Sequence, residues 1–148
     1  MVTIMFDSIL VICTGNICRS PIAERMMRQF LPSKKIDSAG VGAMVGKPAD
    51  EAAFRVSEKH GLSLDGHVAR QFTASMGRNY QLILVMEHDQ LEIVSRVAPE
   101  VRGKTMLLGH WVGGKDIPDP YRKSDEAFES VYQLLECACA KWAEKLGR

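Results

Sequence analysis

The sequence lacks an excess of charge of either sign. Its 148 residues include 19 lysines and arginines and 18 aspartates and glutamates, which leaves a formal net charge of +1 at pH 7. A nearly neutral chain produces no global field for binding nucleic acid or an anionic membrane surface. We therefore expect no nucleic-acid partner, and any site for an anion must be local.

Long apolar runs are also missing. The longest, such as 82–86, are far shorter than the roughly 20 apolar residues that a helix needs to span a bilayer. The N-terminal residues show no basic region followed by an apolar stretch, which a secretion signal would have. We expect no stable membrane insertion and a cytoplasmic location.

Cysteine is scarce, with only Cys13, Cys18, Cys137 and Cys139 present. Neither close pair has the two-residue gap that is typical of zinc ligands and dithiol oxidoreductases. We therefore predict free thiols in a reducing compartment, and we expect no metal ion and no other cofactor. Cys137 and Cys139 fall in a predicted helix, where we expect both to be structural.

No repeat, low-complexity tract or long linker divides the chain, so we predict a single domain over residues 1–148. Short apolar runs alternate with amphipathic stretches, and this alternation predicts an α/β fold. The predicted strands are 8–12, 35–39, 80–86 and 104–108. The predicted helices are 21–31, with Glu24 on its polar face, 50–60, a short helix after Thr73, 87–97 and 124–146. Residues 109–123 are predicted to form an irregular loop.

Residues 13–21, Cys-Thr-Gly-Asn-Ile-Cys-Arg-Ser-Pro, follow a predicted buried strand and lead into a predicted helix. A helix N-terminus at the carboxyl end of a parallel strand directs unpaired N–H groups at an anion. Gly15 and Asn16 tolerate a positive φ, so the loop can turn its amides inward. Arg19 adds a planar fork that matches two phosphate oxygens. The segment predicts an oxyanion site.

A cysteine in the same positive field favours its thiolate, which is the form that attacks phosphorus. Cys13 is then the nucleophile and Arg19 the clamp, while Ser20 can donate its hydroxyl to the sulfur. The alternative is that Cys13 is a small buried hydrophobic residue at the end of a strand, as many free cysteines are. The strand, the Gly-Asn pair and the following Ser-Pro favour the oxyanion site.

Residues 13–20 resemble the signature of the low-molecular-weight protein tyrosine phosphatases, and the similarity continues through 37–40, 67–71 and 119–121 to the final helix. The resemblance implies a three-layer α/β fold, in which a twisted four-stranded parallel sheet lies between helices. It also implies metal-independent hydrolysis of phosphotyrosine through a cysteinyl phosphate on Cys13. The residues that it implies for phosphate and substrate binding are Thr14, Gly15, Asn16, Ile17, Cys18, Ser20, Met44 and Tyr121, besides Arg19.

Asp119 lies between two prolines, in a segment that is also good turn chemistry. From this setting alone, two roles fit Asp119 equally well: a carboxylate that only hydrogen-bonds its own backbone, or a catalytic acid. The resemblance favours catalysis, because the matching aspartate in the family protonates the leaving group and then activates water. Tyr121 matches a tyrosine that packs against the substrate ring.

The resemblance gives supporting roles to three further residues. Ser38 and His67 match residues that hydrogen-bond the loop asparagine, here Asn16, although a lone serine or histidine is usually only hydrogen-bonded filler. Cys18 either fills space in the loop or captures an oxidised Cys13 as a reversible disulfide, as in family members.

Two positions depart from many eukaryotic members of the family. Met44 stands where they have an aromatic residue, which predicts an aliphatic pocket wall, and Arg122 stands where they have a second tyrosine, which puts the known regulation by kinases in doubt. Both features resemble the bacterial branch that is associated with capsule and exopolysaccharide export. That likeness implies a tyrosine autokinase as the protein partner; the sequence assigns no oligomeric state.

Three other functions compete with the phosphatase. An arsenate reductase on the same fold needs two further cysteines near the middle of the chain, and none lies between Cys18 and Cys137. A non-catalytic phosphotyrosine-binding module needs Arg19 but neither a thiolate nor Asp119. A dithiol oxidoreductase that uses Cys13 and Cys18 leaves Arg19 without a role.

Overall fold

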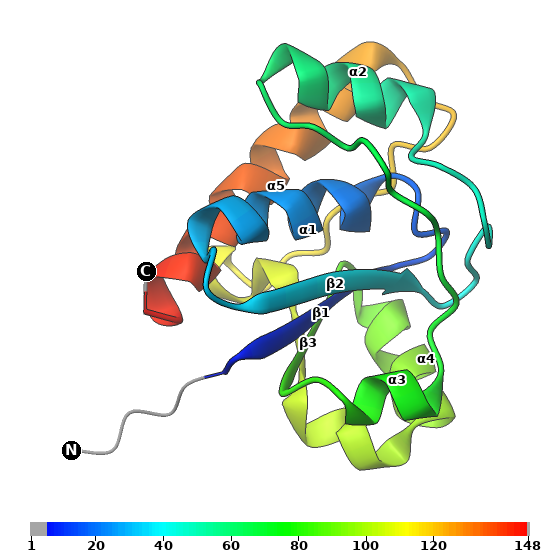
Figure 1. Ribbon diagram of the computed structural model, residues 1–148, viewed down its shortest axis with the longest axis vertical. Helices are drawn as coiled ribbons and strands as arrows, with labels where there is room; N and C mark the ends of the chain where they lie inside the picture. The colour runs from blue at the N-terminus through cyan, green and yellow to red at the C-terminus, as the bar shows by residue number, and fades with distance from the viewer. Residues whose placement is uncertain (1–5, 148) are drawn as a thin grey trace.

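A four-stranded parallel sheet forms the middle layer of the fold. The structure of the protein is a computed structural model, and it describes residues 6–147. In Figure 1, α1, α2 and α5 lie on one side of the sheet, whereas α3 and α4 lie on the other. The predicted three-layer α/β fold is confirmed. The strands are β1 (Ser8–Cys13), β2 (Lys35–Gly40), β3 (Leu82–Val85) and β4 (Thr105–Leu107), the α-helices are α1 (Arg19–Phe30), α2 (Glu51–Lys59), α3 (Ala74–Arg78), α4 (His88–Val97) and α5 (Asp125–Lys145), and the 3₁₀-helices are η1 (Pro99–Lys104) and η2 (Leu108–Val112).

The strand order β2-β1-β3-β4 places β1 in the interior of the sheet. Cys13, at the carboxyl end of β1, is in register with Gly40 of β2. The neighbouring residue Ile12 is in register with Val85 of β3. From β1 the chain continues to β2 on one side and later returns to β3 and β4 on the other side, so the strand order switches between β1 and β3. Ligands of open α/β sheets bind beyond the carboxyl ends of the strands at such a switch point. The fold therefore places Cys13 where a ligand site is expected.

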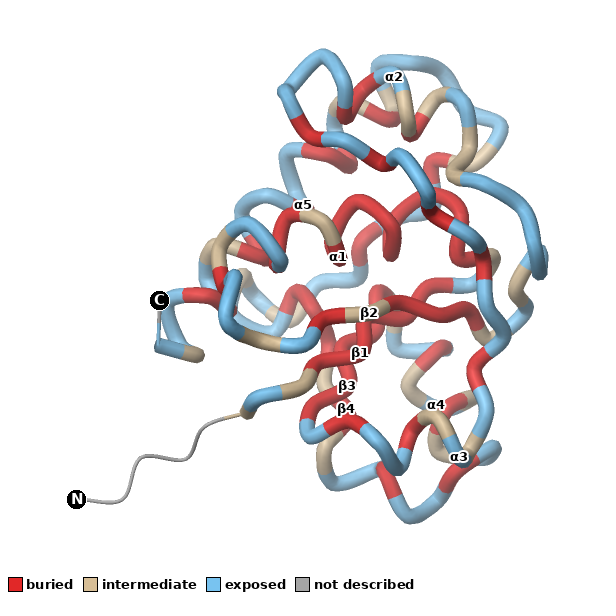
Figure 2. Tube along the Cα trace, viewed as in Figure 1, coloured by how far each residue is buried: buried red, intermediate tan, exposed pale blue. Residues whose placement is uncertain are grey.

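The central strands β1 and β3 are apolar on both faces because helices cover both faces of the sheet. Ile9 and Val11 of β1 belong to a core cluster that includes residues of α1 and α5. Leu10 and Ile12 point the other way, into a second cluster that includes Val94 of α4. Figure 2 shows the strands as an almost continuous buried layer, whereas helices such as α2 and α4 carry exposed residues. The sheet is thus held from both sides, which fixes the loop at its carboxyl end.

Local signals mark several helix ends close to the predicted bounds. The side chains of Asp50, Thr73 and Ser124 accept hydrogen bonds from the first turns of α2, α3 and α5. Gly61 follows α2 with a φ of 77°, the left-handed conformation that glycine adopts readily. Helix α5, the longest at 21 residues, buries one stripe that includes Trp142. No helix within residues 6–147 has both the length and the apolar content that a membrane span requires.

Several details of the sequence-based predictions differ from the structure. Helix α1 begins at Arg19 rather than at residue 21, so the predicted loop arginine is the first helical residue. Residues 109–123 are not wholly irregular, because η2 includes the first four of them. Glu24 is buried rather than on a polar face, since it pairs with the guanidinium groups of Arg25 at 3.0 Å and Arg28 at 3.7 Å. These ion pairs offset the loss of hydration that burial imposes on the carboxylate.

Candidate active site

The loop at 13–18 turns five consecutive carbonyl groups outward. Each carbonyl accepts a hydrogen bond from a segment outside the loop. In a trans peptide the N–H of the next residue points opposite to the carbonyl, and no peptide bond described here is cis. The amides of residues 14–18 therefore face the inside of the loop. The donors to Cys13, Thr14, Gly15, Asn16 and Ile17 are, in that order, the amides of Val41, Gly42 and Met44, Nε2 of His67 and the amide of Asp50, at 3.1, 3.0, 3.0, 2.6 and 2.9 Å.

The sulfur of Cys13 lies among hydrogen-bond donors. The backbone N–H of Asn16 is 3.3 Å from Cys13 Sγ, and the hydroxyl of Ser20 is 2.9 Å from it. The Asn16 side chain donates to Ser20 Oγ at 2.8 Å, so the serine's own proton is available for the sulfur. These donors favour a sulfur that carries negative charge.

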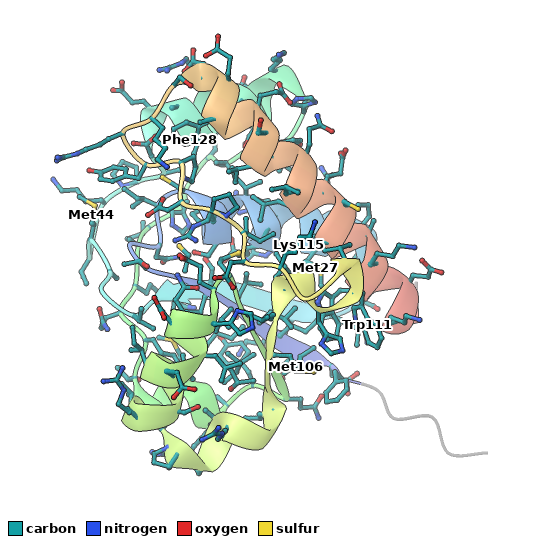
Figure 3. The ribbon with its side chains drawn as sticks, turned by 180° about the vertical axis from the view of Figure 1, so that it is seen from behind. Met27, Met44, Met106, Trp111, Lys115 and Phe128 are labelled. Atoms are coloured by element: carbon teal, nitrogen blue, oxygen red, sulfur yellow. The ribbon has the colours of Figure 1, made fainter. Side chains whose placement is uncertain are left out.

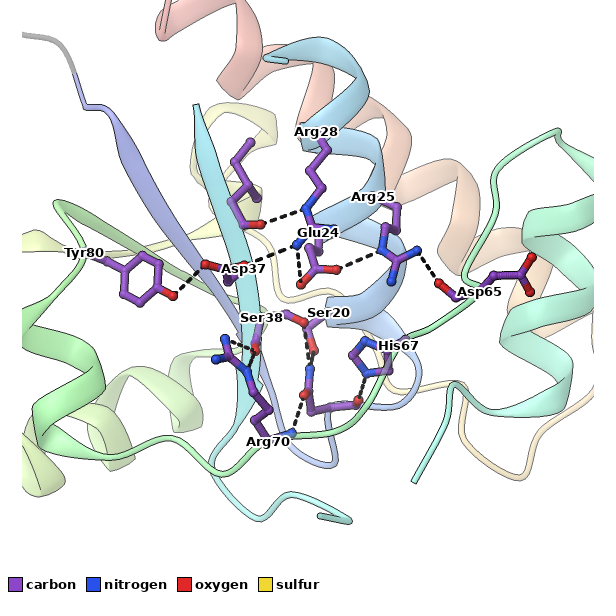
Figure 4. Close-up of polar contacts among 12 residues, drawn as sticks. Ser20, Glu24, Arg25, Arg28, Asp37, Ser38, Asp65, His67, Arg70 and Tyr80 are labelled. Atoms are coloured by element: carbon purple, nitrogen blue, oxygen red, sulfur yellow. Dashed lines mark hydrogen bonds and ion pairs between the residues drawn. The ribbon is translucent and has the colours of Figure 1, made fainter. Parts of the chain in front are cut away.

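Asn16 is the strained residue of the loop. Its φ is 60°, whereas Gly15 does not have a positive φ, so only one of the two residues predicted to tolerate this conformation adopts it. The Asn16 side chain donates to Ser38 Oγ at 3.0 Å and accepts from the Arg70 amide at 2.8 Å. His67 contacts the Asn16 carbonyl through Nε2, and Figure 4 marks this contact with a dashed line from the labelled His67 ring. The structure thus brings Ser38 and His67 against Asn16, in the arrangement that the family resemblance implies for loop support.

The His67 ring has a defined tautomer. A carbonyl oxygen only accepts, so Nε2 of His67 must carry the proton that it shares with Asn16. Burial lowers the pKa of His67, which favours the neutral ring. A neutral His67 therefore donates from Nε2 and leaves Nδ1 as an acceptor.

Arg19 is almost completely buried at the first position of α1. Its Nη1 donates to Glu87 Oε1 at 2.6 Å and to the Ile117 carbonyl at 2.7 Å. Its Nη2 lies 3.6 Å from Asp119 Oδ2, and its Nε has no hydrogen-bond partner among residues 6–147. One edge of the guanidinium is therefore anchored, while Nε, on another edge, is left unsatisfied. A buried N–H without a partner is costly, and an oxyanion in the cavity would supply the missing acceptor.

A cavity of about 160 Å³ opens in front of Cys13 and Arg19. Asp119 and Tyr121 line it from the loop before α5, and Met44 lines it from the loop after β2. Asp119 Oδ1 accepts from the Tyr121 amide at 3.0 Å, which fixes the carboxylate in the turn. Met44 lies at the outer edge of the molecule in Figure 3. The predicted acid, the aromatic wall and the aliphatic wall are thus placed around one cavity; its lining residues are Cys13, Thr14, Gly15, Ile17, Cys18, Arg19, Gly42, Met44, Asp119 and Tyr121.

The remaining cysteines differ in their surroundings. Cys18 lines the same cavity, and burial is the main cause that raises the pKa of its thiol, so it is a neutral thiol in the wall. Cys139 is buried in α5, where its sulfur lies 3.9 Å from the Ala23 carbonyl. Cys137 is exposed. The prediction that both cysteines of α5 are structural is therefore wrong for Cys137, because a residue two positions from Cys139 lies on another face of the helix.

Two residues at the start of α4 belong to this site, although the sequence analysis missed them. Glu87 is the N-cap residue of α4 and holds Arg19, and Gln90 contacts both Glu87 and Thr14. A signal was present, because an acceptor followed three residues later by glutamine, directly after a buried strand, has the spacing of a capping box. That signal predicts a helix start but not a partner for Arg19.

A larger groove of about 530 Å³ lies between α2 and α5. None of the predicted site residues lines it, and its walls carry basic and acidic side chains such as Arg55 and Glu129. Within residues 6–147 no cluster of three histidine, cysteine or acidic side chains is arranged to hold a metal ion. The chemistry that the sequence predicts is therefore concentrated in the smaller cavity.

Comparisons with known proteins identify the family of the chain. The family model described as low molecular weight phosphotyrosine protein phosphatase matches residues 8–148. Low molecular weight protein-tyrosine-phosphatase Etp from Escherichia coli strain K12 is 57% identical, and the match covers 100% of both chains. The crystal structure of the tyrosine phosphatase Wzb from Escherichia coli K30 in complex with sulphate is 68% identical with a TM-score of 0.95, and the match covers 97% of this chain and 100% of that chain. Wzb from Vibrio vulnificus in complex with benzylphosphonate is 48% identical with a TM-score of 0.94, over 95% and 99% of the two chains.

The fold and its relatives define the class of protein: this chain is a protein-tyrosine phosphatase. It belongs to the low molecular weight phosphotyrosine protein phosphatase family. Several of its relatives carry the names Wzb, Etp and AmsI. The predicted family and enzyme class are confirmed, and this decides for the phosphatase over the arsenate reductase, binding-module and oxidoreductase alternatives.

Proposed function

We propose that the protein hydrolyses phosphotyrosine through a cysteinyl-phosphate intermediate on Cys13. The observation that carries this proposal is the ring of inward-facing amides around Cys13 Sγ, which the five outward-held carbonyls create. Such a ring binds the three terminal oxygens of a phosphoryl group and leaves the sulfur behind the phosphorus. The unpartnered Nε of Arg19 supports the same site, because it is a buried donor beside the cavity.

In the first step the Cys13 thiolate forms an S–P bond while the bond between phosphorus and the tyrosine oxygen breaks. The leaving phenolate takes a proton from the Asp119 carboxyl, which is exposed enough to reach a ligand in the cavity. In the second step the Asp119 carboxylate takes a proton from water, the water oxygen attacks phosphorus, and the S–P bond breaks. Inorganic phosphate leaves, and the Cys13 thiolate and the Asp119 carboxyl are restored.

A comparison of aryl phosphates tests this mechanism. The wild-type protein is expected to hydrolyse p-nitrophenyl phosphate and phenyl phosphate in the presence of a chelator. Cys13→Ser is expected to abolish turnover of both, while Cys137→Ser, at an exposed cysteine that does not line the cavity, retains it. Asp119→Asn is expected to slow phenyl phosphate more than p-nitrophenyl phosphate, because the poorer leaving group depends more on the acid. Unchanged turnover in Cys13→Ser, or an equal slowing of both substrates in Asp119→Asn, contradicts the mechanism.

We also propose that the physiological substrate is a bacterial tyrosine autokinase of capsule or exopolysaccharide synthesis, and that the protein acts in the cytoplasm. The resemblance to that bacterial branch at Met44 and Arg122 supports the substrate. A cysteine nucleophile needs a reducing compartment, which supports the cytoplasm. A substrate-trapping pull-down with Cys13→Ser tests the partner. Recovery of a tyrosine-phosphorylated kinase that inorganic phosphate elutes supports the proposal, and recovery of only other phosphoproteins contradicts it.

A further inference from the structure

One buried side-chain amide connects helix α4 to the phosphate loop. Gln90 is the third residue of α4, and only 2% of its surface is exposed. Its Oε1 accepts from the backbone N–H groups of Met86 at 2.8 Å and Glu87 at 3.0 Å. Its Nε2 donates to Thr14 Oγ1 at 3.1 Å and, at the longer distance of 3.4 Å, to Glu87 Oε1. All four hydrogen-bonding positions of the amide are therefore used.

The partners of Gln90 fix which end of the amide is the oxygen. Backbone N–H groups only donate, and the carboxylate of Glu87 only accepts. Rotating the amide by half a turn would place its NH₂ against two N–H donors and its oxygen against a carboxylate. Only one orientation satisfies the site, so Gln90 acts as a rigid bridge.

The bridge leads to both parts of the phosphate site. Glu87 Oε1, which Gln90 contacts, is also the oxygen that accepts from Arg19 Nη1 at 2.6 Å. Thr14 directly follows the nucleophile Cys13 in the loop, and its own carbonyl is held by Gly42. We propose that Gln90 is a positioning residue of the phosphatase reaction, which sets the Arg19 guanidinium through Glu87 and the start of the phosphate loop through Thr14. The inference rests on the proposed function of Cys13 and Arg19.

Gln90 also caps α4, and the two roles use different atoms. The cap depends on Oε1, which holds the amides of Met86 and Glu87, whereas the positioning role depends on Nε2. Gln90→Glu keeps an acceptor of the same length, and a carboxylate at a helix N-terminus is favourable. It removes the donors to Thr14 and Glu87 and places two carboxylates side by side. Gln90→Met has the same length and removes both sets of hydrogen bonds.

The experiment measures kcat and KM for p-nitrophenyl phosphate, the inhibition constant of inorganic phosphate, and Tm. Both variants at position 90 are expected to lose about 10- to 100-fold in kcat, because a misplaced clamp costs most in the transition state. The inhibition constant of phosphate is expected to change by less than about threefold, since the loop amides still bind the ground state. Both variants are expected to lose stability, Gln90→Met because it loses the cap and Gln90→Glu because it buries a second carboxylate beside Glu87, so Tm alone does not separate the two roles.

A pH series separates positioning from a general loss of structure. In Gln90→Glu, protonation of the introduced carboxyl restores one donor toward Thr14 or Glu87. The ratio of its kcat to that of the wild type is therefore expected to rise as the pH falls from 8 to 5. The charged and titratable groups near this point are Glu87, Arg19, Cys13, the exposed His88–Asp116 pair and, across the cavity, Asp119, and they are present in both proteins.

Thr105→Val is the matched control. Thr105 is a buried polar residue of β4 whose Oγ1 donates to the Val101 carbonyl at 2.8 Å, and it does not line the cavity. Its replacement is expected to lower Tm and leave kcat unchanged. The inference is wrong if the Gln90 variants keep kcat within about twofold of the wild type, or if Thr105→Val loses as much activity as Gln90→Met. An inactive wild-type protein would instead contradict the proposed function itself.

Discussion

Gly40 ends β2 directly beside the phosphate loop, and its replacement by alanine is expected to damage both stability and catalysis. A Cβ at this position would lie 2.3 Å from the Thr14 carbonyl oxygen and 3.1 Å from the Asn16 amide. Gly40 itself is held on both sides, because its N–H donates to the Arg70 carbonyl at 2.9 Å and its carbonyl accepts from the Phe72 amide at 2.8 Å. The loop must therefore yield rather than the strand.

The size of the effect follows from the overlap. Restoring ordinary contact requires the Thr14 carbonyl to move by roughly 1 Å, and overpacking of this kind typically costs about 1–3 kcal/mol. For a protein of this length, about 2 kcal/mol lowers Tm by roughly 4–8 °C. A displacement of about 1 Å near the reacting atoms can reduce the rate by about 100-fold.

The assay compares three alanine variants by thermal unfolding and by kcat/KM for p-nitrophenyl phosphate. A Cβ at Gly103 would have no heavy atom within 4 Å, so Gly103→Ala is expected to match the wild type in both measurements. A Cβ at Gly42 would meet only the Thr14 side chain, at 3.9 Å, so Gly42→Ala is expected to keep the wild-type Tm. The steric argument is refuted if Gly40→Ala unfolds at the temperature of Gly42→Ala and turns over as fast as Gly103→Ala.

Two further predictions concern a strained residue and a surface carboxylate. Asn16→Gly keeps access to the positive φ and loses the side-chain hydrogen bonds, whereas Asn16→Ala loses both. The alanine variant is therefore expected to be less stable than the glycine variant by about 1 kcal/mol in urea unfolding. Equal stability of the two variants would show that the backbone at position 16 is not strained. Hydrogen bonds from Gln133, Lys59 and His60 lower the pKa of Glu129 to about 2, so its contribution to stability is present above its ordinary pKa of 4.5 and is lost as the pH falls toward 2. Glu129→Gln is expected to have a lower Tm than the wild type at pH 7, and the difference should shrink as the pH falls below 4.5; a difference that is constant with pH would show that the charge is not responsible.

Much of the fold follows from local patterns. Apolar runs give the central strands β1 and β3, and the capping residues Asp50, Thr73 and Ser124 mark helix starts, because these signals act on the backbone within one turn. The exceptions have tertiary causes. Glu24 is buried together with the guanidinium groups of Arg25 and Arg28, which reach Asp65 and Asp37 of distant segments, as Figure 4 shows.

The candidate site likewise combines residues that the sequence brings together with contacts that only the tertiary structure makes. Cys13, Asn16 and Arg19 lie within seven consecutive residues, so their grouping at a strand-to-helix turn was determined by the sequence itself. Only the tertiary structure decided which segments hold the loop: the amides of Val41 and Gly42 pull its carbonyls outward, and Glu87 lies 68 residues from the arginine that it anchors. The physical reason is that spacing along a chain reports backbone conformation over a few residues, whereas the order of strands in the sheet determines which distant donors and acceptors meet.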